Sequence, residues 1–200
     1  AEGRSYVSDG FAHALAFSVN ERAPGPEKLL LDEPGTVSVE ARVAFSPEIP
    51  RAVAYGTLEA EEGRRVSGDT RILHAEQRFE DTVANVPRLV EIVVNGEVAA
   101  SKSVVADGKI HDLAFQIPVS KSAWVALRSF PQLHTNPVTV EIAGQPIRAS
   151  KASARWCELS VDLLWQNRRR FIAEHERDTA RAAYERARQR YRQIARECAP

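Results

Sequence analysis

Residues 88–105 read RLVEIVVNGEVAASKSVV, and this stretch decides the fold. Asn95-Gly96 at its centre suits a two-residue type I′ turn, because both central positions of that turn take a positive φ. The apolar and small residues on either side are typical of strands. The stretch therefore predicts a β-hairpin, and further strand patterns lie before and after it.

Two segments ahead of the hairpin alternate apolar and polar residues with the period of a half-buried strand. In residues 11–19, FAHALAFSV, the alternation predicts one face made of Phe11, His13, Leu15, Phe17 and Val19. In residues 36–45, TVSVEARVAF, it predicts one face made of Val37, Val39, Ala41, Val43 and Phe45. Each segment thus has one side for a core and one for solvent.

Three more strand candidates follow the hairpin: IHDLAFQIPV at 110–119, AWVALRSF at 123–130 and PVTVEIAGQPIRA at 137–149. Turn signals such as Asp9-Gly10 and Asp107-Gly108 separate the candidates. About seven to nine short strands separated by such turns are typical of an antiparallel sandwich. We therefore expect a mainly β fold, an immunoglobulin-like β-sandwich over residues 1–150.

The period changes after residue 150, which predicts an α-helical C-terminal extension of two helices over residues 151–200. The first helix carries apolar residues at helical spacing, namely Trp156, Leu159, Leu163 and Leu164. The second runs from Asn167 to about Cys198 with an apolar stripe of Tyr184, Ala187, Tyr191 and Ile194. Such a stripe packs on its own domain or against the helices of a second copy in a homo-oligomer, and own-domain packing is the commoner case.

The composition is that of a soluble globular chain, with 44% hydrophobic and 27% charged residues and no net charge. The apolar runs are too short for a membrane helix. Residues 167–200 hold ten Arg against five acidic residues. A basic helix can bind nucleic acid, but Arg alternating with Glu is typical of a solvated helix face. We expect neither nucleic acid nor a membrane as partner.

The chain has no methionine and begins at Ala1, so we expect an excised or processed piece of a longer protein. Its two cysteines, Cys157 and Cys198, fall on different predicted helices at unequal distances from the turn between them. A disulfide needs Cα atoms within about 7 Å. We therefore expect two free thiols.

The sequence contains no recognised catalytic motif. The five histidines stand at 13, 74, 111, 134 and 175, and none belongs to a metal-ligand array. Asp9-Gly10-x-x-His13 is echoed by Asp107-Gly108-x-x-His111. The echo could bring two histidines together on a metal, but histidines bonded to turn backbone explain it better. We predict no catalytic residue, no metal and no cofactor.

Residues 122–142, SAWVALRSFPQLHTNPVTVEI, form either a functional loop or a joint between strands. Trp124 suits the core tryptophan of a sandwich, and Trp156 and Trp165 also fit core positions. Arg128 at the strand end is expected to bond a carboxylate or turn carbonyls. A structural joint explains every residue of the polar cluster before Pro137 except His134. We therefore predict an interface or binding turn made of Arg128, His134, Thr135 and Asn136.

Four stretches resemble the C-terminal region of CehA/McbA-type metallohydrolases of the PHP superfamily. They are GRSYVSDGFAHALAFSVN (3–20), DGKIHDLAF (107–115), the segment 122–140 and the helical segment 152–198. The catalytic metal site of that family lies in an upstream barrel with an Asp-x-His-x-His-Thr type signature. His134-Thr135 here lacks the preceding histidine, so no catalytic residue carries over.

The resemblance implies a non-catalytic accessory domain that braces an upstream catalytic domain of the same chain or mediates assembly. It also allows a secreted or periplasmic bacterial protein. The alternative is a stand-alone β-sandwich module that binds carbohydrate or protein. A small hydrolase in its own right would need a nucleophile or metal that the sequence does not present.

Overall fold

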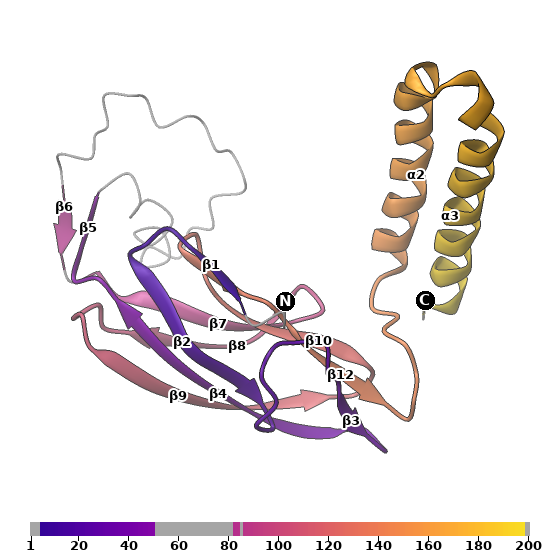
Figure 1. Ribbon diagram of the computed structural model, residues 1–200. Coiled ribbons are helices and arrows are strands. Elements are labelled where there is room, and N and C mark those ends of the chain that lie inside the picture. Colours follow the sequence, from indigo (N-terminus) through magenta and orange to yellow (C-terminus); the bar gives the residue numbers. More distant parts are fainter. Residues whose placement is uncertain (1–4, 51–81, 85, 199–200) are drawn as a thin grey trace. The chain divides into compact units, whose positions relative to one another are not determined.

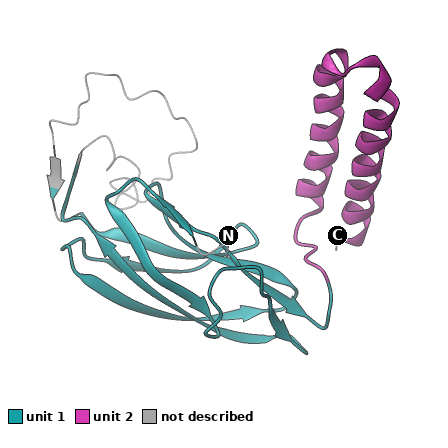
Figure 2. Ribbon diagram, in the orientation of Figure 1, with its two compact units in different colours: residues 1–145 teal, residues 146–200 magenta. Residues whose placement is uncertain are grey.

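The computed structural model describes residues 5–50, 82–84 and 86–198. The chain forms two compact units, residues 1–145 and 146–200 (Figure 2). The first unit is built of strands and the second of helices (Figure 1). The division falls between Gln145 and Pro146, five residues before the predicted boundary.

The first unit holds a seven-stranded and a three-stranded sheet (Figure 1). The larger sheet consists of β1 (Tyr6–Ser8), β3 (Leu29–Leu31), β7 (Arg88–Val94), β8 (Glu97–Val104), β10 (Ala123–Ser129), β11 (Leu133–Thr135) and β12 (Val138–Ile142). The smaller sheet consists of β2 (Ala12–Val19), β4 (Gly35–Phe45) and β9 (Ile110–Val119). A separate ribbon pairs β5 (Glu48–Pro50) with β6 (Thr82–Ala84). All these pairings are antiparallel except β12 with β3.

Side chains from both sheets form one hydrophobic core, which makes the unit a β-sandwich. From the smaller sheet, β4 contributes all five predicted residues, each at most 2% exposed. From the larger sheet come Val90, Ile92, Val125 and Leu127, all fully buried. Burying such a side chain contributes roughly 1.5–3 kcal/mol. The predicted mainly β fold with two C-terminal helices is confirmed.

Strand β2 departs from the predicted alternation. Its register against β4 shifts between Ala14 and Ala16, which marks a β-bulge. A bulge inserts one residue and so exchanges the two faces of the strand. Ala14 is therefore buried before the bulge, whereas His13 and Leu15 are exposed. The predicted face is correct for Phe17 and Val19 and wrong for His13 and Leu15.

The hairpin of β7 and β8 forms as predicted. Asn95 and Gly96 take φ values of 53° and 96°, as the two-residue turn requires. The Asn95 side chain also accepts a hydrogen bond from the backbone N–H of Trp124 at 3.1 Å. The turn is thereby tied to β10. Trp124 itself is half-buried and lies on the face of β10 opposite Val125, so its prediction as the core tryptophan is wrong.

The second unit is a helical hairpin. Its elements are α2 (Lys151–Arg168), η1 (Arg169–Phe171), η2 (Glu174–Glu176) and α3 (Arg177–Glu197). Ser150 caps α2 by accepting a hydrogen bond from the N–H of Ser153. The second helix therefore begins ten residues later than predicted from Asn167, because two short 3-10 turns occupy the connection.

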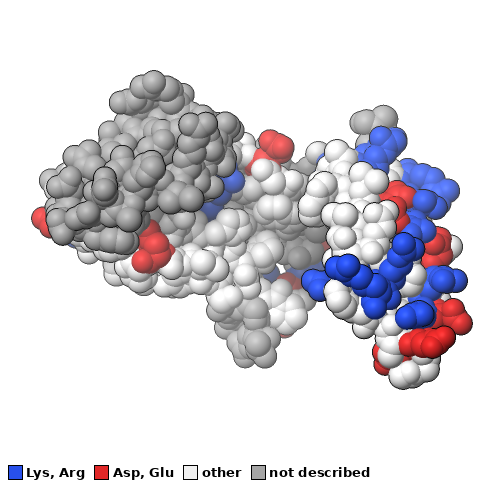
Figure 3. Space-filling view, turned by 90° about the horizontal axis from the view of Figure 1, so that it is seen from above, with Lys and Arg blue, Asp and Glu red and all other residues white. Residues whose placement is uncertain are grey.

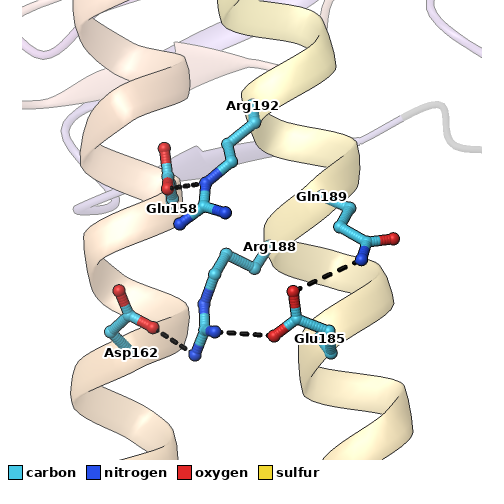
Figure 4. Close-up of polar contacts among 6 residues, drawn as sticks. All are labelled: Glu158, Asp162, Glu185, Arg188, Gln189 and Arg192. Atoms are coloured by element: carbon cyan, nitrogen blue, oxygen red, sulfur yellow. Dashed lines mark hydrogen bonds and ion pairs between the residues drawn. The ribbon is translucent and has the colours of Figure 1, made fainter.

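The two helices pack through a mixed apolar and ionic seam. Trp165 and Tyr184 stack with ring centroids 5.2 Å apart, and the predicted stripe on α3 is half-buried along its length. Arg188 bridges Asp162 on α2, at 2.5 Å, and Glu185 on α3, at 2.6 Å (Figure 4). The stripe thus packs within its own hairpin.

Apolar residues of α2 also lie on its outer side. Trp156, Leu159 and Leu163 are 69%, 66% and 59% exposed, so the prediction of Trp156 as a core residue is wrong. They follow one another at steps of three and four residues, which places them on one helix face. We call these three residues the α2 ridge.

Charge is divided between the units. Residues 146–200 contain 13 basic and 7 acidic residues, which leaves 14 basic and 20 acidic residues for 1–145. Lys and Arg gather on the helical unit with acidic residues interspersed (Figure 3). Cys157 and Cys198 are free thiols, as predicted. Among the described residues, no helix is both long and apolar enough to cross a membrane.

A candidate site at one end of the larger sheet

The segment 133–137 is a joint at which β10 changes its partner. One edge of β10 pairs with β11 through Arg128 and Ser129, and with β12 through residues 123–125. Between the two pairings, the Thr135 hydroxyl accepts a hydrogen bond from the N–H of Leu127 at 3.0 Å and contacts its carbonyl at 3.3 Å. The side chain thereby replaces the backbone partner that the ladder lacks here.

Thr135 and Asn136 serve this joint. Thr135 is 4% exposed, so its prediction as a surface binding residue is wrong. The exposed Asn136 donates its backbone N–H to the carbonyl of Ser5 at 2.9 Å and its side-chain amide to the Ser5 hydroxyl at 3.0 Å. Thr135 and Asn136, two of the four residues of the predicted turn, therefore have structural roles.

Arg128 forms an ion pair with Glu91 of the neighbouring strand β7. Its Nε lies 2.6 Å from the Glu91 carboxylate, whose side chain is only 11% exposed. The expectation that Arg128 bonds a carboxylate is confirmed. Val7, His134, Arg128 and Glu91 pair successively across β1, β11, β10 and β7, which puts all four on one face of the sheet. That face is the one turned away from the core.

His134 is the exposed polar residue of this row. Its Nδ1 lies 2.7 Å from the carbonyl oxygen of its neighbour Thr135. Because a carbonyl only accepts, Nδ1 carries the hydrogen and Nε2 is left to accept from a ligand when the ring is neutral. His134 thus presents one polar atom outward.

Of the residues described above, Val7, Arg128 and His134 line a shallow hollow of about 430 Å³. Its walls come from β1, the end of β10 and the connection to β11, and are largely apolar. Val7 and Phe130 on its rim are 76% and 68% exposed. The full lining is Val7, Ser8, Asp9, Arg128, Phe130, Pro131, Gln132, Leu133 and His134.

Gln132 and Asp9, which the sequence analysis did not single out together, form a hydrogen-bonded pair in the lining of the hollow. Gln132 is 2% exposed and donates its amide to the Asp9 carboxylate at 3.2 Å. The N–H of Asp9 in turn donates to the carbonyl of Gln132 at 3.1 Å. The two residues are 123 positions apart, so no local pattern could have joined them.

The echoed histidines do not converge. His111 pairs with core-facing Val43, whereas His13 pairs with Ala44, so the two rings leave opposite faces of the smaller sheet. His13 contacts the Tyr6 hydroxyl at 3.0 Å. His74 lies outside the described residues. In the described parts of the chain, no three His, Cys, Asp or Glu residues are grouped as metal ligands.

His111 instead bonds the aspartate of its own turn. Its Nε2 lies 2.8 Å from Asp107 Oδ1, which also accepts from the N–H of Lys109. The hydrogen bond from His111, followed by the one from Lys109, lowers the pKa of the Asp107 carboxyl. The echo is therefore a repeated turn, since Asp9 likewise accepts from the N–H of Phe11 two residues on.

Comparison with known proteins identifies no family for the chain and finds only remote structural similarity. No protein-family model and no curated protein matches the chain. Among solved structures, the C-terminal domain of Wzt is similar with 8% identity and a TM-score of 0.34, over 73% of this chain and 84% of that one. The CARDB domain of a Pyrococcus furiosus protein, in complex with di-metal ions, has 10% identity and a TM-score of 0.31 over 66% and 96% of the chains.

Proposed function

We propose that the chain is a non-catalytic accessory domain of a larger metal-dependent hydrolase of the CehA/McbA type, and that it braces the catalytic domain. The four similar sequence stretches support the family assignment. One structural observation carries the role: the hollow beside β1 combines exposed Val7 and Phe130 with the polar His134 and Arg128. Apolar contacts flanked by a few placed polar groups are what a protein interface needs.

The position of the hollow favours the upstream domain as its occupant. Val7 and Ser8 of strand β1 line the hollow, together with Asp9 directly after it. In a parent chain of the proposed type, the catalytic domain would join the sandwich at this strand. Its surface would therefore meet the hollow without a long connection, at little cost in chain entropy.

The test uses the parent protein. Phe130→Ala and His134→Ala should lower its thermal unfolding temperature and its activity together, because they weaken the contact between domains. Leu30→Ala is the matched control, since Leu30 is also 68% exposed but lies on β3 outside the hollow. Equal effects of Phe130→Ala and Leu30→Ala would contradict bracing through this surface.

Assembly is the second role that an accessory domain could have, and here we propose a homo-oligomer through α2. The predicted contact stripe on α3 faces its own partner helix, as the Trp165–Tyr184 contact indicates. The α2 ridge carries no charge and has the three- and four-residue steps of a helix–helix seam. An antiparallel second copy would bring Trp156 against Leu163 of the other chain around Leu159.

The exposed Phe130 also suits the alternative, a stand-alone module that binds carbohydrate or protein, because ligand sites combine aromatic side chains with a few placed polar groups. Retention on polysaccharide affinity gels that Phe130→Ala abolishes would favour this alternative over bracing. Unretarded passage of the wild-type chain would dismiss carbohydrate binding.

A further inference from the structure

The helical unit carries a groove whose walls are strongly basic. It lies between α2 and α3 at the end where α2 begins, and its volume is about 520 Å³. Lys151 and Arg155 line one side, and Arg192 and Arg196 line the other. The buried Ala195 has a small side chain, which leaves room between the walls. The remaining lining residues are Glu158 and Gln189.

Within the described residues, three of the four cations have no ion-pair partner. Arg192 is paired with Glu158 at 2.5 Å (Figure 4). Lys151, Arg155 and Arg196 are exposed and form no ion pair or side-chain hydrogen bond within the described parts of the chain. Four cations and one carboxylate leave the groove lining with a net charge of +3.

This arrangement runs against the usual helix pattern. Lys151 and Arg155 are four residues apart on α2, as are Arg192 and Arg196 on α3. Like charges at that spacing repel and destabilise a helix. Arg188, by contrast, is neutralised by Asp162 and Glu185. A destabilising arrangement of charges that has no evident structural benefit marks a candidate functional site.

From this groove we infer a binding site for an oligophosphate group of a small molecule. Guanidinium groups match phosphate oxygens with paired hydrogen bonds, and Lys151 adds a flexible point charge. The net charge of the lining balances a diphosphate better than a single carboxylate. The positive end of the α2 dipole lies at the same end of the hairpin and adds to the attraction.

The size of the groove favours a small ligand over a polymer. Each cation pair spans four residues, about 6 Å along a helix. Nucleic acid instead needs basic side chains spread along several phosphates of its backbone. The volume lies in the range of small-molecule sites, about 300–1,000 Å³.

The test is calorimetric titration of the whole chain with inorganic pyrophosphate at low ionic strength. The groove variant Arg155→Gln with Arg196→Gln removes two unpaired cations. The control, Arg181→Gln with Arg186→Gln, removes two exposed arginines of α3 outside the groove. Both variants carry the same net charge, so a general electrostatic effect would weaken their pyrophosphate binding equally.

We expect saturable binding with a Kd below about 1 mM. The groove variant should bind at least about 10-fold more weakly, because charge-assisted hydrogen bonds are lost. The control should stay within about twofold. Lys151→Gln alone should also weaken binding, and inorganic phosphate should bind more weakly than pyrophosphate. Thermal unfolding should show the groove variant at least as stable as the wild type, since repulsion is removed.

Two results would overturn the inference. One is the absence of saturable heat with the folded wild-type chain. The other is equal weakening by groove and control variants, together with tighter binding of a single-stranded oligonucleotide than of pyrophosphate. That outcome would mean that the basic hairpin attracts any polyanion.

Discussion

At the residue scale, the polar cluster of the joint divides into structural and exposed members. Thr135 completes backbone hydrogen bonding where β10 changes partner, and Asn136 bonds Ser5 just ahead of β1. Arg128 compensates the nearly buried carboxylate of Glu91. His134 remains as the outward polar group. The cluster was visible in the sequence, but its division was not, because burial depends on strands distant along the chain.

Thr135→Val should destabilise the sandwich by about 1–3 kcal/mol, because it leaves the N–H and carbonyl of Leu127 without their side-chain partner. Chemical denaturation measures the change. Thr139→Val, on half-buried Thr139 of β12, should stay within about 0.5 kcal/mol. Equal losses for the two variants would refute the ladder role of Thr135.

Arg128→Ala should cost on the order of 2–3 kcal/mol of unfolding free energy, since the Glu91 carboxylate would lose its partner in a nearly buried position. Arg42→Ala breaks the pair with Asp112, whose side chains are 55% and 74% exposed. That control should cost less than about 1 kcal/mol. Denaturant titrations of both variants at one pH measure the two losses of unfolding free energy. A smaller loss for Arg128→Ala than for Arg42→Ala would contradict the role of Arg128 as partner of Glu91.

Asp107 should give the sandwich a pH-dependent contribution to stability. Its pKa is lowered in the folded chain from an ordinary value of 3.8, mainly by His111. The folded state therefore binds fewer protons, and the contribution is present above the ordinary pKa and is lost as the pH falls through the folded one. Asp107→Asn should differ most from wild type above about pH 4 and converge with it in stronger acid. A difference that grows in acid would reverse the sign and contradict the assignment.

At the scale of elements, local patterns predicted strands and helices well where one pattern persists. β4 follows its alternation without a break, and the Asn95-Gly96 turn has the expected φ values. β2 fails in its first half because a bulge exchanges its faces. Trp156 of the α2 ridge was predicted as a core residue, because helical spacing alone does not say which of two apolar faces a partner covers.

The α2 ridge predicts the behaviour of the chain in solution. Leu159→Glu should convert a dimer into a monomer, since it places a charge at the centre of the proposed seam. Light scattering after gel filtration measures the mass. Phe171→Glu is the control, because Phe171 is 69% exposed but lies in η1 between the helices. A monomeric wild type, or dissociation by both substitutions, would contradict assembly through α2.

At the scale of the whole molecule, the sequence predicted the two kinds of structure and nearly their boundary. The periods of strands and helices differ, and the change is visible after residue 150. The hollow was not predictable as a site, because it joins β1 to the end of β10 through pairs such as Asp9 and Gln132. The basic groove likewise depends on the pairing of two helices. Long-range pairing, rather than local preference, decides where both sites lie.

We propose that this chain supports catalysis by another domain of its parent protein and performs none itself. The most direct test of this proposal is the metal content of the purified chain by mass spectrometry, after dialysis against trace Zn²⁺ and Mn²⁺. We expect less than about a tenth of an equivalent of metal, since a tight site needs convergent ligands. One equivalent retained through dialysis would contradict the accessory role and make the chain a candidate metalloenzyme.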